Sequence, residues 1–422
     1  MYTIGGAMLP DVPELLPALV ELYKDLHAHP ELSFAEHRTA AVVAEWLDTL
    51  GCEVTTGVGR TGVVGVLRNG DGPTVMLRAD FDALPVAEAT GLPYRSVATA
   101  VDADGQTVPV MHACGHDMHV VWLLGATAVL AADPDAWSGT VLLVFQPAEE
   151  VGAGADAMVD DGLFERFGTP VVALGQHVIA GPAGTVLYRP GVAMAASDSL
   201  KVRLIGRGGH GSRPETTVDP VVMAASAVMR LQTVVSREVA PTDTAVVTVG
   251  SMRAGTKANI IPGEAELRLS IRTFEPSVRE RVMAAVERVL EGEAVSAGAP
   301  ERPEISTLYS FQRVENDVEA TGRVAAALRE AFGPERVVEV PAVTGSEDFG
   351  VFGRRGGFPS VFWWIGGSDP EAYALAEKAG RVAQDIPNNH SPYFAPVLDP
   401  TLAAGVEAMT AAALSWLAVR PA

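Results

Sequence analysis

The sequence predicts an α/β protein in which a catalytic domain on a mainly parallel sheet is interrupted by an inserted α+β, ferredoxin-like module. Three observations favour this fold class. The 422 residues exceed what one hydrophobic core usually serves, so we expect two domains. Short, continuous apolar segments occur on both sides of the middle of the chain, as in strands that are covered on both faces. The strands in the middle alternate apolar and polar residues, which is typical of a sheet with one face in water.

The first part of the chain alternates helix and strand patterns. Four leucines at helical spacing predict an amphipathic helix that ends near residues 29–30, namely Leu15, Leu19, Leu22 and Leu26. Runs rich in Val and Leu predict buried strands at 63–67, 74–77, 140–145 and 171–174. A helical stretch at 115–132 lies between two of these runs, and this alternation indicates an α/β unit.

The middle of the chain has a different pattern. Ala265, Leu267, Leu269 and Ile271 alternate with charged and polar residues, so one face of this strand meets water. The expected order is strand 200–205, helix 220–235, strand 245–252, strand 265–273, helix 278–291 and strand 303–308, which is the βαββαβ order of a ferredoxin-like module. Apolar runs return at 337–340 and 360–365, and an Ala-rich helix begins near 401. We therefore predict a discontinuous catalytic domain at 1–196 and 310–422, with an inserted dimerisation and lid domain at 197–309.

Composition narrows the classes of partner. The chain has 31 Lys and Arg against 52 Asp and Glu, a net charge of −21, which repels nucleic acid and anionic membranes. Its two cysteines, Cys52 and Cys114, do not form a disulfide scaffold and favour a reducing compartment. The N-terminal residues lack the pattern of an export signal, and the longest apolar run, 120–132, is shorter than the roughly 20 residues that span a bilayer. We expect a soluble, cytoplasmic protein that binds a small molecule.

The densest chemical signal is the segment Met111-His112-Ala113-Cys114-Gly115-His116-Asp117-Met118-His119. Cys114 stands where the predicted helix begins, and the positive end of a helix dipole favours the thiolate that binds metals. His116 lies two residues later, so that both side chains can meet at one ion in a turn that opens a helix. The sequence does not decide whether His112 and His119 support a ligand residue or only pack in the core.

Other candidate ligands are found elsewhere in the chain. Glu149 and Glu150 follow the predicted strand 140–145, and the carboxyl ends of strands are where open α/β sheets gather their active-site groups. Adjacent side chains diverge outside a helix, so one carboxylate can bind a metal while the other addresses a water molecule. His177 falls at another predicted strand end, and His390 lies near the C-terminus. Five groups thus offer ligands for two transition-metal ions if one group bridges them: Cys114, His116, Glu150, His177 and His390.

Four ordered segments, HACGHDMH, QPAEE, GQHV and NHSPYF, resemble those of the M20 family of metallopeptidases and amidohydrolases. The likeness is to its aminoacylase-like branch, which includes hippurate hydrolases, auxin-conjugate amidohydrolases and N-acetyl-diaminopimelate deacetylases. It extends from about residue 27 to 396. The resemblance implies that Cys114 bridges two metals, that the other four residues complete the sites, and that Glu149 is the general base.

The resemblance also assigns residues outside this set. The strand motif His-x-Asp of many M20 enzymes reads Arg78-Ala79-Asp80 here, which removes one usual ligand. Asp80 then either orients a ligand histidine or forms a salt bridge with Arg78. His210 matches a histidine that reaches across a dimer interface to the scissile carbonyl oxygen. Asn259 and Arg272 match positions that hold the amide and the carboxylate of the substrate, and a homodimer is implied, with a tetramer as the alternative.

The sequence therefore predicts a di-metal amidohydrolase that cleaves N-acyl-amino acids or similar amides with a free carboxylate. Zinc or manganese is the expected metal, with cobalt or nickel as alternatives. Two other functions stay open. One is a thiol hydrolase with Cys114 as the nucleophile. The other is a protein that binds an amide or peptide without catalysis, which the missing strand histidine favours.

Overall fold

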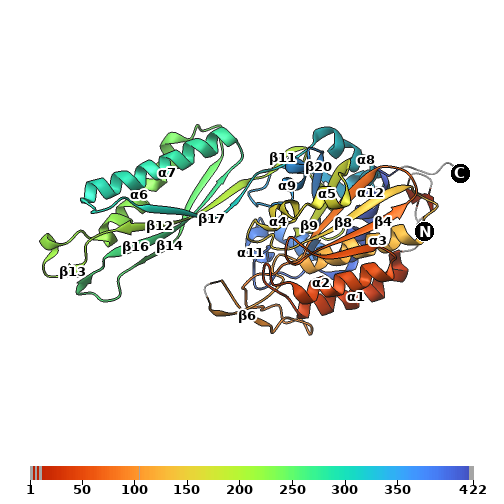
Figure 1. The fold of residues 1–422 in the computed structure, drawn as a ribbon, viewed down its shortest axis with the longest axis horizontal. Coiled ribbons are helices and arrows are strands. Elements are labelled where there is room, and N and C mark those ends of the chain that lie inside the picture. The colour runs from red at the N-terminus through yellow and green to blue at the C-terminus, as the bar shows by residue number, and fades with distance from the viewer. Residues whose placement is uncertain (1–2, 5–6, 9–11, 104, 418–422) are drawn as a thin grey trace. The chain divides into compact units, whose positions relative to one another are not determined.

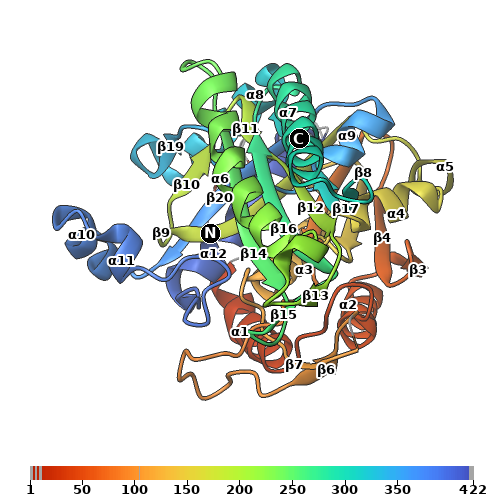
Figure 2. The same cartoon turned by 90° about the vertical axis from the view of Figure 1, so that its left-hand side faces the viewer.

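The computed structural model describes residues 3–4, 7–8, 12–103 and 105–417, and it divides into two compact units (Figures 1 and 2). The larger unit comprises Met1–Ala193, Glu315–Ala342 and Glu347–Ala422, as far as these segments are described. The smaller unit comprises Met194–Val314 and Val343–Ser346. The smaller unit therefore interrupts the larger one in the chain.

An eight-stranded sheet forms the centre of the larger unit. Its strand order is β19 (Val337–Glu339), β10 (Val186–Tyr188), β20 (Ser360–Ser368), β9 (Val172–Pro182), β5 (Thr74–Asp80), β8 (Gly139–Gln146), β4 (Gly62–Asn69) and β3 (Glu53–Val58). The central four strands, from β20 to β8, run parallel to one another. Strands β4 and β3 add an antiparallel edge on one side, and β10 runs antiparallel to β20 on the other. The predicted mainly parallel sheet is confirmed, whereas the antiparallel edges were not predicted.

Five long helices pack with this sheet: α1 (Val12–Ala28), α2 (His37–Thr49), α3 (His116–Ala132), α8 (Val318–Phe332) and α12 (Leu398–Leu414). Helix α3 is buried along nearly its whole length, because apolar residues occupy every face of it. It lies against α12, where a Cβ atom on Gly405 would come within 2.1 Å of Trp122. A glycine at position 405 is therefore required by the close approach of these two helices.

The remaining elements of the larger unit are short. They are β1 (Thr3–Ile4), β2 (Ala7–Met8), β6 (Thr99–Val101), β7 (Thr107–Pro109), α4 (Gly154–Asp160), α5 (Leu163–Phe167), a 3₁₀ turn at Pro334–Arg336, α9 (Gly350–Gly356), α10 (Pro370–Lys378) and α11 (Val382–Asp385). Strands β11 (Gly191–Met194) and β18 (Val314–Asn316) lie where the chain passes between the units. Among the described residues, no helix combines the length and the apolar character needed to cross a bilayer.

The smaller unit has the predicted βαββαβ order. It consists of β12 (Ala196–Ile205), α6 (Pro220–Glu238), β14 (Ala245–Ala254), β16 (Glu264–Thr273), α7 (Pro276–Ala297) and β17 (Glu304–Phe311). The sheet order β14-β16-β12-β17 is antiparallel throughout, which is the ferredoxin-like arrangement. The apolar residues of β16 are buried in a core shared with α6 and α7, as their alternation predicted. The opposite face carries ion pairs such as Lys201 with Glu266 at 3.0 Å.

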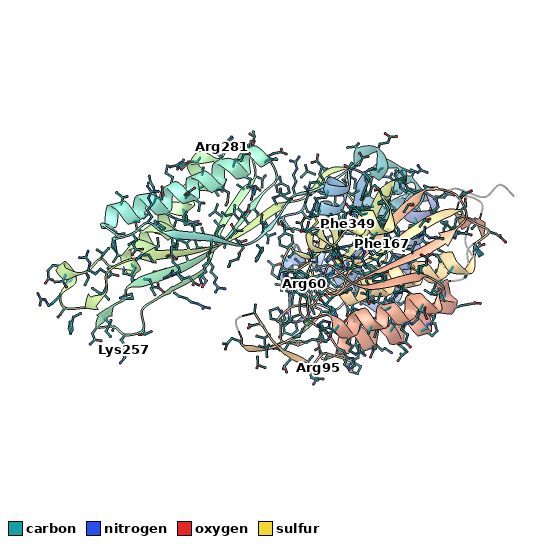
Figure 3. All side chains as sticks on the ribbon, viewed as in Figure 1. Arg60, Arg95, Phe167, Lys257, Arg281 and Phe349 are labelled. Atoms are coloured by element: carbon teal, nitrogen blue, oxygen red, sulfur yellow. The ribbon has the colours of Figure 1, made fainter. Side chains whose placement is uncertain are left out.

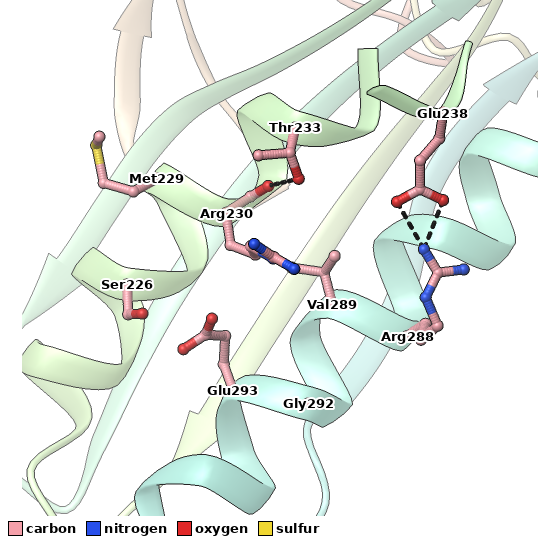
Figure 4. Close-up of a pocket in the computed structure, with 9 residues that line it drawn as sticks. All are labelled: Ser226, Met229, Arg230, Thr233, Glu238, Arg288, Val289, Gly292 and Glu293. Atoms are coloured by element: carbon pink, nitrogen blue, oxygen red, sulfur yellow. Dashed lines mark hydrogen bonds and ion pairs between the residues drawn. The ribbon is translucent and has the colours of Figure 1, made fainter. Parts of the chain in front are cut away.

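Two further features complete the smaller unit. A two-stranded sheet of β13 (Gly209–His210) and β15 (Ile260–Ile261) adjoins a 3₁₀ turn at Pro214–Thr216. A pocket of about 650 Å³ opens between α6 and α7 (Figure 4). Its polar rim includes Glu238, which pairs with Arg288 at 2.5 Å. None of the predicted site residues lines this pocket.

Candidate metal centre

In the larger unit, β9 and the residues that follow β8 lie close to the start of α3. Cys114 and Gly115 precede the helix, and Gly115 has φ 82°, the left-handed region that favours glycine. A Cβ atom on Gly115 would lie 2.4 Å from a methyl carbon of Val178 in β9. The first turn of α3 is thus pressed against β9, next to His177. Glu149 and Glu150 follow β8, two strands away in the sheet.

His177 lies within β9 and not after its end, which corrects the expected strand boundary at residue 174. The strand continues because β20 pairs with it in parallel through Trp364, opposite His177, and on to Pro182. His177 Nδ1 lies 2.7 Å from the carbonyl oxygen of Val178, so this nitrogen carries the proton and donates it. The lone pair of Nε2 therefore faces Cys114 Sγ at 3.4 Å.

The five predicted ligands lie together. Ligand atoms of Cys114, His116 and Glu150 are all within 4.8 Å of one another. His390 Nε2 lies 3.4 Å from the Oε2 atom of Glu150, and His177 contacts Cys114 as described. The residues come from four segments that are as far apart as positions 114 and 390. Their convergence is the geometric arrangement that the sequence predicted, while their individual roles remain proposals.

Buried polar atoms at this site lack partners. Within the described part of the chain, both ring nitrogens of His116 and the Oε1 atom of Glu150 are buried without a hydrogen bond. His116 Nε2 stands 3.8 Å from Asp80 Oδ2, 3.9 Å from Glu149 Oε2 and 3.8 Å from Glu150 Oε1. These separations are too long for hydrogen bonds but leave space between atoms that are all lone-pair donors. A divalent cation fits this arrangement, because a thiolate, imidazoles and carboxylates are its usual ligands and unpaired buried acceptors are costly.

Two of the four described non-glycine residues with positive φ angles belong to the same site. Ala148 and His390 adopt positive φ angles of 50° and 70°, although neither is glycine. The turn at His390 is held because its backbone N–H donates to the carbonyl of Ala113 at 2.8 Å. The neighbouring Asn389 donates from Nδ2 to the carbonyls of Val178 at 3.0 Å and Cys114 at 3.2 Å. Asn389 therefore joins the C-terminal ligand segment to the start of α3.

Asp80 forms the expected salt bridge with Arg78, and the histidine that it contacts, His119, is not one of the five predicted ligands. Its Oδ1 atom lies 2.5 Å from His119 Nδ1, and its Oδ2 atom accepts from Arg78 Nη1 at 2.7 Å. The histidine that it orients is His119, whose Nε2 accepts from the Val178 N–H at 2.8 Å. His119 also packs against the ring of His177, with ring centroids 4.3 Å apart. Both nitrogens of His119 are thus engaged in support of His177.

Arg78 is fully buried and binds three acidic side chains. Besides Asp80, it donates from Nη2 to Glu347 at 2.7 Å and to Asp348 at 3.3 Å. Its guanidinium also lies 5.9 Å from the ring centre of Phe349, a side chain labelled in Figure 3. The segment Gly345–Phe349 therefore contributes two carboxylates that the sequence did not assign. The pKa of Glu149 is raised well above its usual range by burial and by the nearby carboxylates of Glu347 and Glu150. A raised pKa suits a group that accepts a proton and later returns it.

A second buried polar cluster lies on the other side of the α3 start. His27 stands between two carboxylates, with Nδ1 2.7 Å from Asp117 Oδ2 and Nε2 3.2 Å from Glu88 Oε1. Burial opposes the charge on His27, but these two carboxylates raise its pKa to about 10. His112 is buried nearby without hydrogen bonds, and burial lowers its pKa to about 4. Neither His27 nor Glu88 was predicted, because each is an isolated residue in the sequence.

The smaller unit holds the other three predicted residues, but at two separate places. His210 and Asn259 are neighbours, since β13 pairs His210 with Ile260 and the Gly211 N–H donates to Asn259 at 2.8 Å. Arg272 lies near the other end of β16, where its Nη1 donates to Ser346 Oγ at 2.6 Å. The register pairs Ile205 with Glu264 and Ser197 with Arg272. Eight residues of strand, at about 3.4 Å each, thus place about 27 Å between the two ends.

Comparisons with known proteins agree with this geometry. The sequence profile described as "Peptidase family M20/M25/M40" matches residues 76–414. The chain belongs to this family. It is 38% identical to a hippurate hydrolase of Campylobacter jejuni, covering 82% of this chain and 87% of that one. It is 34% identical to an N-acetylcysteine deacetylase of Bacillus subtilis, covering 89% and 95%.

A solved structure extends the family likeness to three dimensions. A Bacillus subtilis protein described as a dinuclear metal-binding peptidase of the M20 family superposes with a TM-score of 0.71 at 29% identity. The match covers 95% of this chain and 98% of that one. The M20 membership and the fold class expected from the sequence are therefore both confirmed.

Proposed function

We propose that this M20 protein is a metal-dependent amidohydrolase that cleaves N-acyl-amino acids. The observation that carries the proposal is the convergence of Cys114, His116, Glu150, His177 and His390 around buried atoms that lack hydrogen bonds. These five residues would hold two divalent cations. The activities named for the relatives, on hippurate and on N-acetylcysteine, support a substrate that is an acylated amino acid.

Two such cations, when bound, polarise an amide carbonyl and lower the pKa of a water molecule. The chain itself supplies the movement of the proton. Glu149 accepts a proton from the attacking water and transfers it to the amide nitrogen as the bond between carbon and nitrogen breaks. The products are a carboxylic acid and a free amino acid.

Arg272 and Asn259 recognise the substrate in this proposal. The guanidinium of Arg272 can meet a carboxylate with two parallel hydrogen bonds, and its contact with Ser346 holds it in place. Asn259 would hold the amide, and His210 would stabilise the negative charge that develops on the carbonyl oxygen. Their separation from Arg272 along β16 favours an arrangement in which His210 and Asn259 act on the site of a partner subunit.

We propose that residues 1–196 and 310–422 form the catalytic domain, and that residues 197–309 mediate dimerisation and cover the site. A homodimer is the simplest assembly that lets one module serve another site, and a tetramer of two such dimers is the alternative. Zinc or manganese is the proposed metal, and cobalt or nickel would suit the same thiolate and imidazole ligands. The absence of a bond between Cys52 and Cys114 is compatible with the proposed cytoplasmic location.

The test is the variant Glu149→Gln, assayed on N-benzoyl- and N-acetyl-amino acids with its metal content measured. We expect turnover to fall by at least about 10²-fold, because a general base usually accelerates the reaction by at least this factor. The metal content should stay at the wild-type level. Wild-type turnover in this variant would exclude Glu149 as the base. A thiol hydrolase would instead keep its activity in chelator and lose it on alkylation of Cys114.

A further inference from the structure

Three consecutive backbone N–H groups, those of Ala148, Glu149 and Glu150, point at two buried carboxylates. The Ala148 N–H donates to Glu36 Oε1 at 2.9 Å. The Glu149 and Glu150 N–H groups each donate at 3.1 Å to Asp82, the former to Oδ1 and the latter to Oδ2. Both carboxylates are buried, with at most 1% of either residue exposed. They come from distant segments, before α2 and after β5.

Both carboxylates are themselves held in place. The hydroxyl of Ser33 donates to Asp82 Oδ2 at 2.7 Å. The hydroxyl of Thr61 donates to Glu36 Oε2 at 2.5 Å, and the Phe34 N–H donates to Glu36 Oε1 at 2.9 Å. Each carboxylate therefore binds one side-chain hydroxyl in addition to the amide groups. A buried carboxylate with this many donors is fixed in orientation.

The turn at residues 148–150, which these carboxylates bind, is strained and contains the proposed general base and one proposed ligand. Ala148 has φ 50°, a conformation that costs a non-glycine residue free energy unless its surroundings compensate. The turn directs the side chains of Glu149 and Glu150 to different positions, Glu149 toward Glu347 and Glu150 toward His390. Asp82 also stands 3.3 Å from His116 Nδ1, the ring nitrogen opposite the one that faces the acidic cluster. One carboxylate thus contacts the backbone of both glutamates and the ring of a proposed ligand.

We propose that Asp82 and Glu36 form an amide clamp, a pair of positioning residues that fixes the general base Glu149 and the ligands Glu150 and His116 relative to one another. The inference rests on the proposed function and goes beyond it, because neither clamp residue contacts the substrate. Asp82 uses both of its oxygens for backbone amides, so an asparagine at this position would direct its NH₂ group at an N–H. Glu36 uses only Oε1 for amides, so a glutamine at position 36 can keep those bonds while the Thr61 hydroxyl turns to accept.

This difference provides the test. Asp82→Asn and Glu36→Gln each replace a buried carboxyl group by an amide, but only the first loses an amide acceptor. We expect Asp82→Asn to lower kcat by about 10²-fold at saturating metal, with KM within about threefold of wild type, because small displacements of a catalytic group have effects of this size. Glu36→Gln should retain most of the turnover that Glu36→Ala loses. Ser33→Ala, which removes a hydrogen bond to the same Asp82 carboxylate but none to the turn, is the matched control and should lower kcat far less than Asp82→Asn does.

A second readout does not depend on turnover. Titration of the metal-free protein with Co²⁺, followed by the absorption of the cobalt–thiolate bond, measures affinity directly. We expect Asp82→Asn to weaken Co²⁺ binding by about tenfold or more, as for other residues that support a ligand, and Ser33→Ala to leave it unchanged. If Asp82→Asn fails to fold, the Glu36→Ala and Glu36→Gln pair carries the same comparison.

The outcomes separate the clamp from the proposed function. Wild-type kcat and Co²⁺ affinity in Asp82→Asn would overturn the clamp and leave the hydrolase intact. Equal losses in Ser33→Ala and Asp82→Asn would also overturn it, since the effect would then be general loosening. A wild-type protein that hydrolyses no amide would contradict the proposed function, and the Co²⁺ titration would then decide the clamp alone.

Discussion

His210 and Arg272 are held at opposite ends of β16: His210 stands in the small β13–β15 sheet beside the Glu264 end, and Arg272 lies eight residues, about 27 Å, along the strand from Glu264. An N-acyl-amino acid is far shorter than this distance, so one substrate cannot contact both residues of one module. If both act in catalysis, each site must take Arg272 from one subunit and His210 from another.

This separation predicts complementation between two inactive variants. Glu149→Gln and His210→Ala homodimers should each have little activity. After the two are unfolded together and refolded, half of the dimers are mixed, and each mixed dimer has one site with both wild-type groups. We therefore expect about one quarter of the wild-type activity, measured by substrate turnover. Recovery no greater than the sum of the two parent activities would place His210 and Glu149 in the same chain's site or exclude His210 from catalysis.

Arg272 should determine the preference for a free carboxylate. Replacing it with Ala removes a charged hydrogen-bond donor, and we expect KM for an N-acyl-amino acid to rise by about 10- to 100-fold. The KM of Arg272→Lys should lie between those of the wild type and Arg272→Ala, because an ammonium group keeps the charge but cannot form the paired hydrogen bonds. The control is the matching N-acyl amine without the carboxylate, whose hydrolysis should be equally slow in all three proteins. A uniform loss on both substrates would instead indicate a structural role for Arg272.

His27 predicts a pH dependence of stability. Its pKa is about 10 in the folded protein against 6.5 for an unperturbed histidine, because Asp117 and Glu88 outweigh burial. The other titratable groups beside it, Tyr23 and Tyr94, have raised pKa values owing to burial and to these carboxylates, and so stay neutral. The charged His27 therefore stabilises the folded protein. This stabilisation is complete below pH 6.5 and is lost as the pH rises toward 10.

The measurement is the free energy of unfolding of wild type and His27→Gln by urea, from pH 6.5 to 10. We expect the wild type to be more stable at the low end and the difference to shrink steadily as the pH rises. A difference that stays constant over this range would mean that His27 is neutral in the folded protein.

Arg78 should be essential for stability, because three buried carboxylates share its charge. Arg78→Met keeps the volume but leaves Asp80, Glu347 and Asp348 without their cation. We expect a loss of about 3–5 kcal/mol in the free energy of unfolding, measured by urea in chelator so that metal binding does not contribute. Arg381→Ala, which breaks an exposed pair with Asp385, is the control and should change little. A loss below about 1 kcal/mol in Arg78→Met would contradict the proposed importance of this ion-pair network.

The sequence was sufficient to predict the two-part fold and the convergence of the five ligands. Strand periodicity distinguished the two sheets, and segment 111–119 is dense in metal-binding residue types. His177 and His390 are single histidines, which became candidates only beside the other segments and through the resemblance to the M20 family. Asp80 forms the salt bridge with Arg78 that one of its two interpretations predicted, while the orientation of a ligand histidine stays a prediction, because Asp80 contacts His119, which is outside the predicted ligand set.

Other features depend on contacts that a linear sequence does not display. Asp82 binds amides 67 and 68 positions away, and His27 meets a carboxylate 90 positions away. Backbone amides carry no sequence signal, so the clamp could not be predicted from residue types. The extension of β9 through His177 was missed because β20, about 190 residues later, supplies the partner.

The central claim is that five distant side chains hold two cations that the hydrolysis requires. Its most direct test is elemental analysis of the purified protein, combined with turnover of an N-acyl-amino acid before chelation, after chelation and after metal is restored. We expect about two transition-metal ions per subunit, loss of turnover with the metal and its recovery on addition of zinc or manganese. Undiminished turnover in protein shown to contain no metal would contradict this claim.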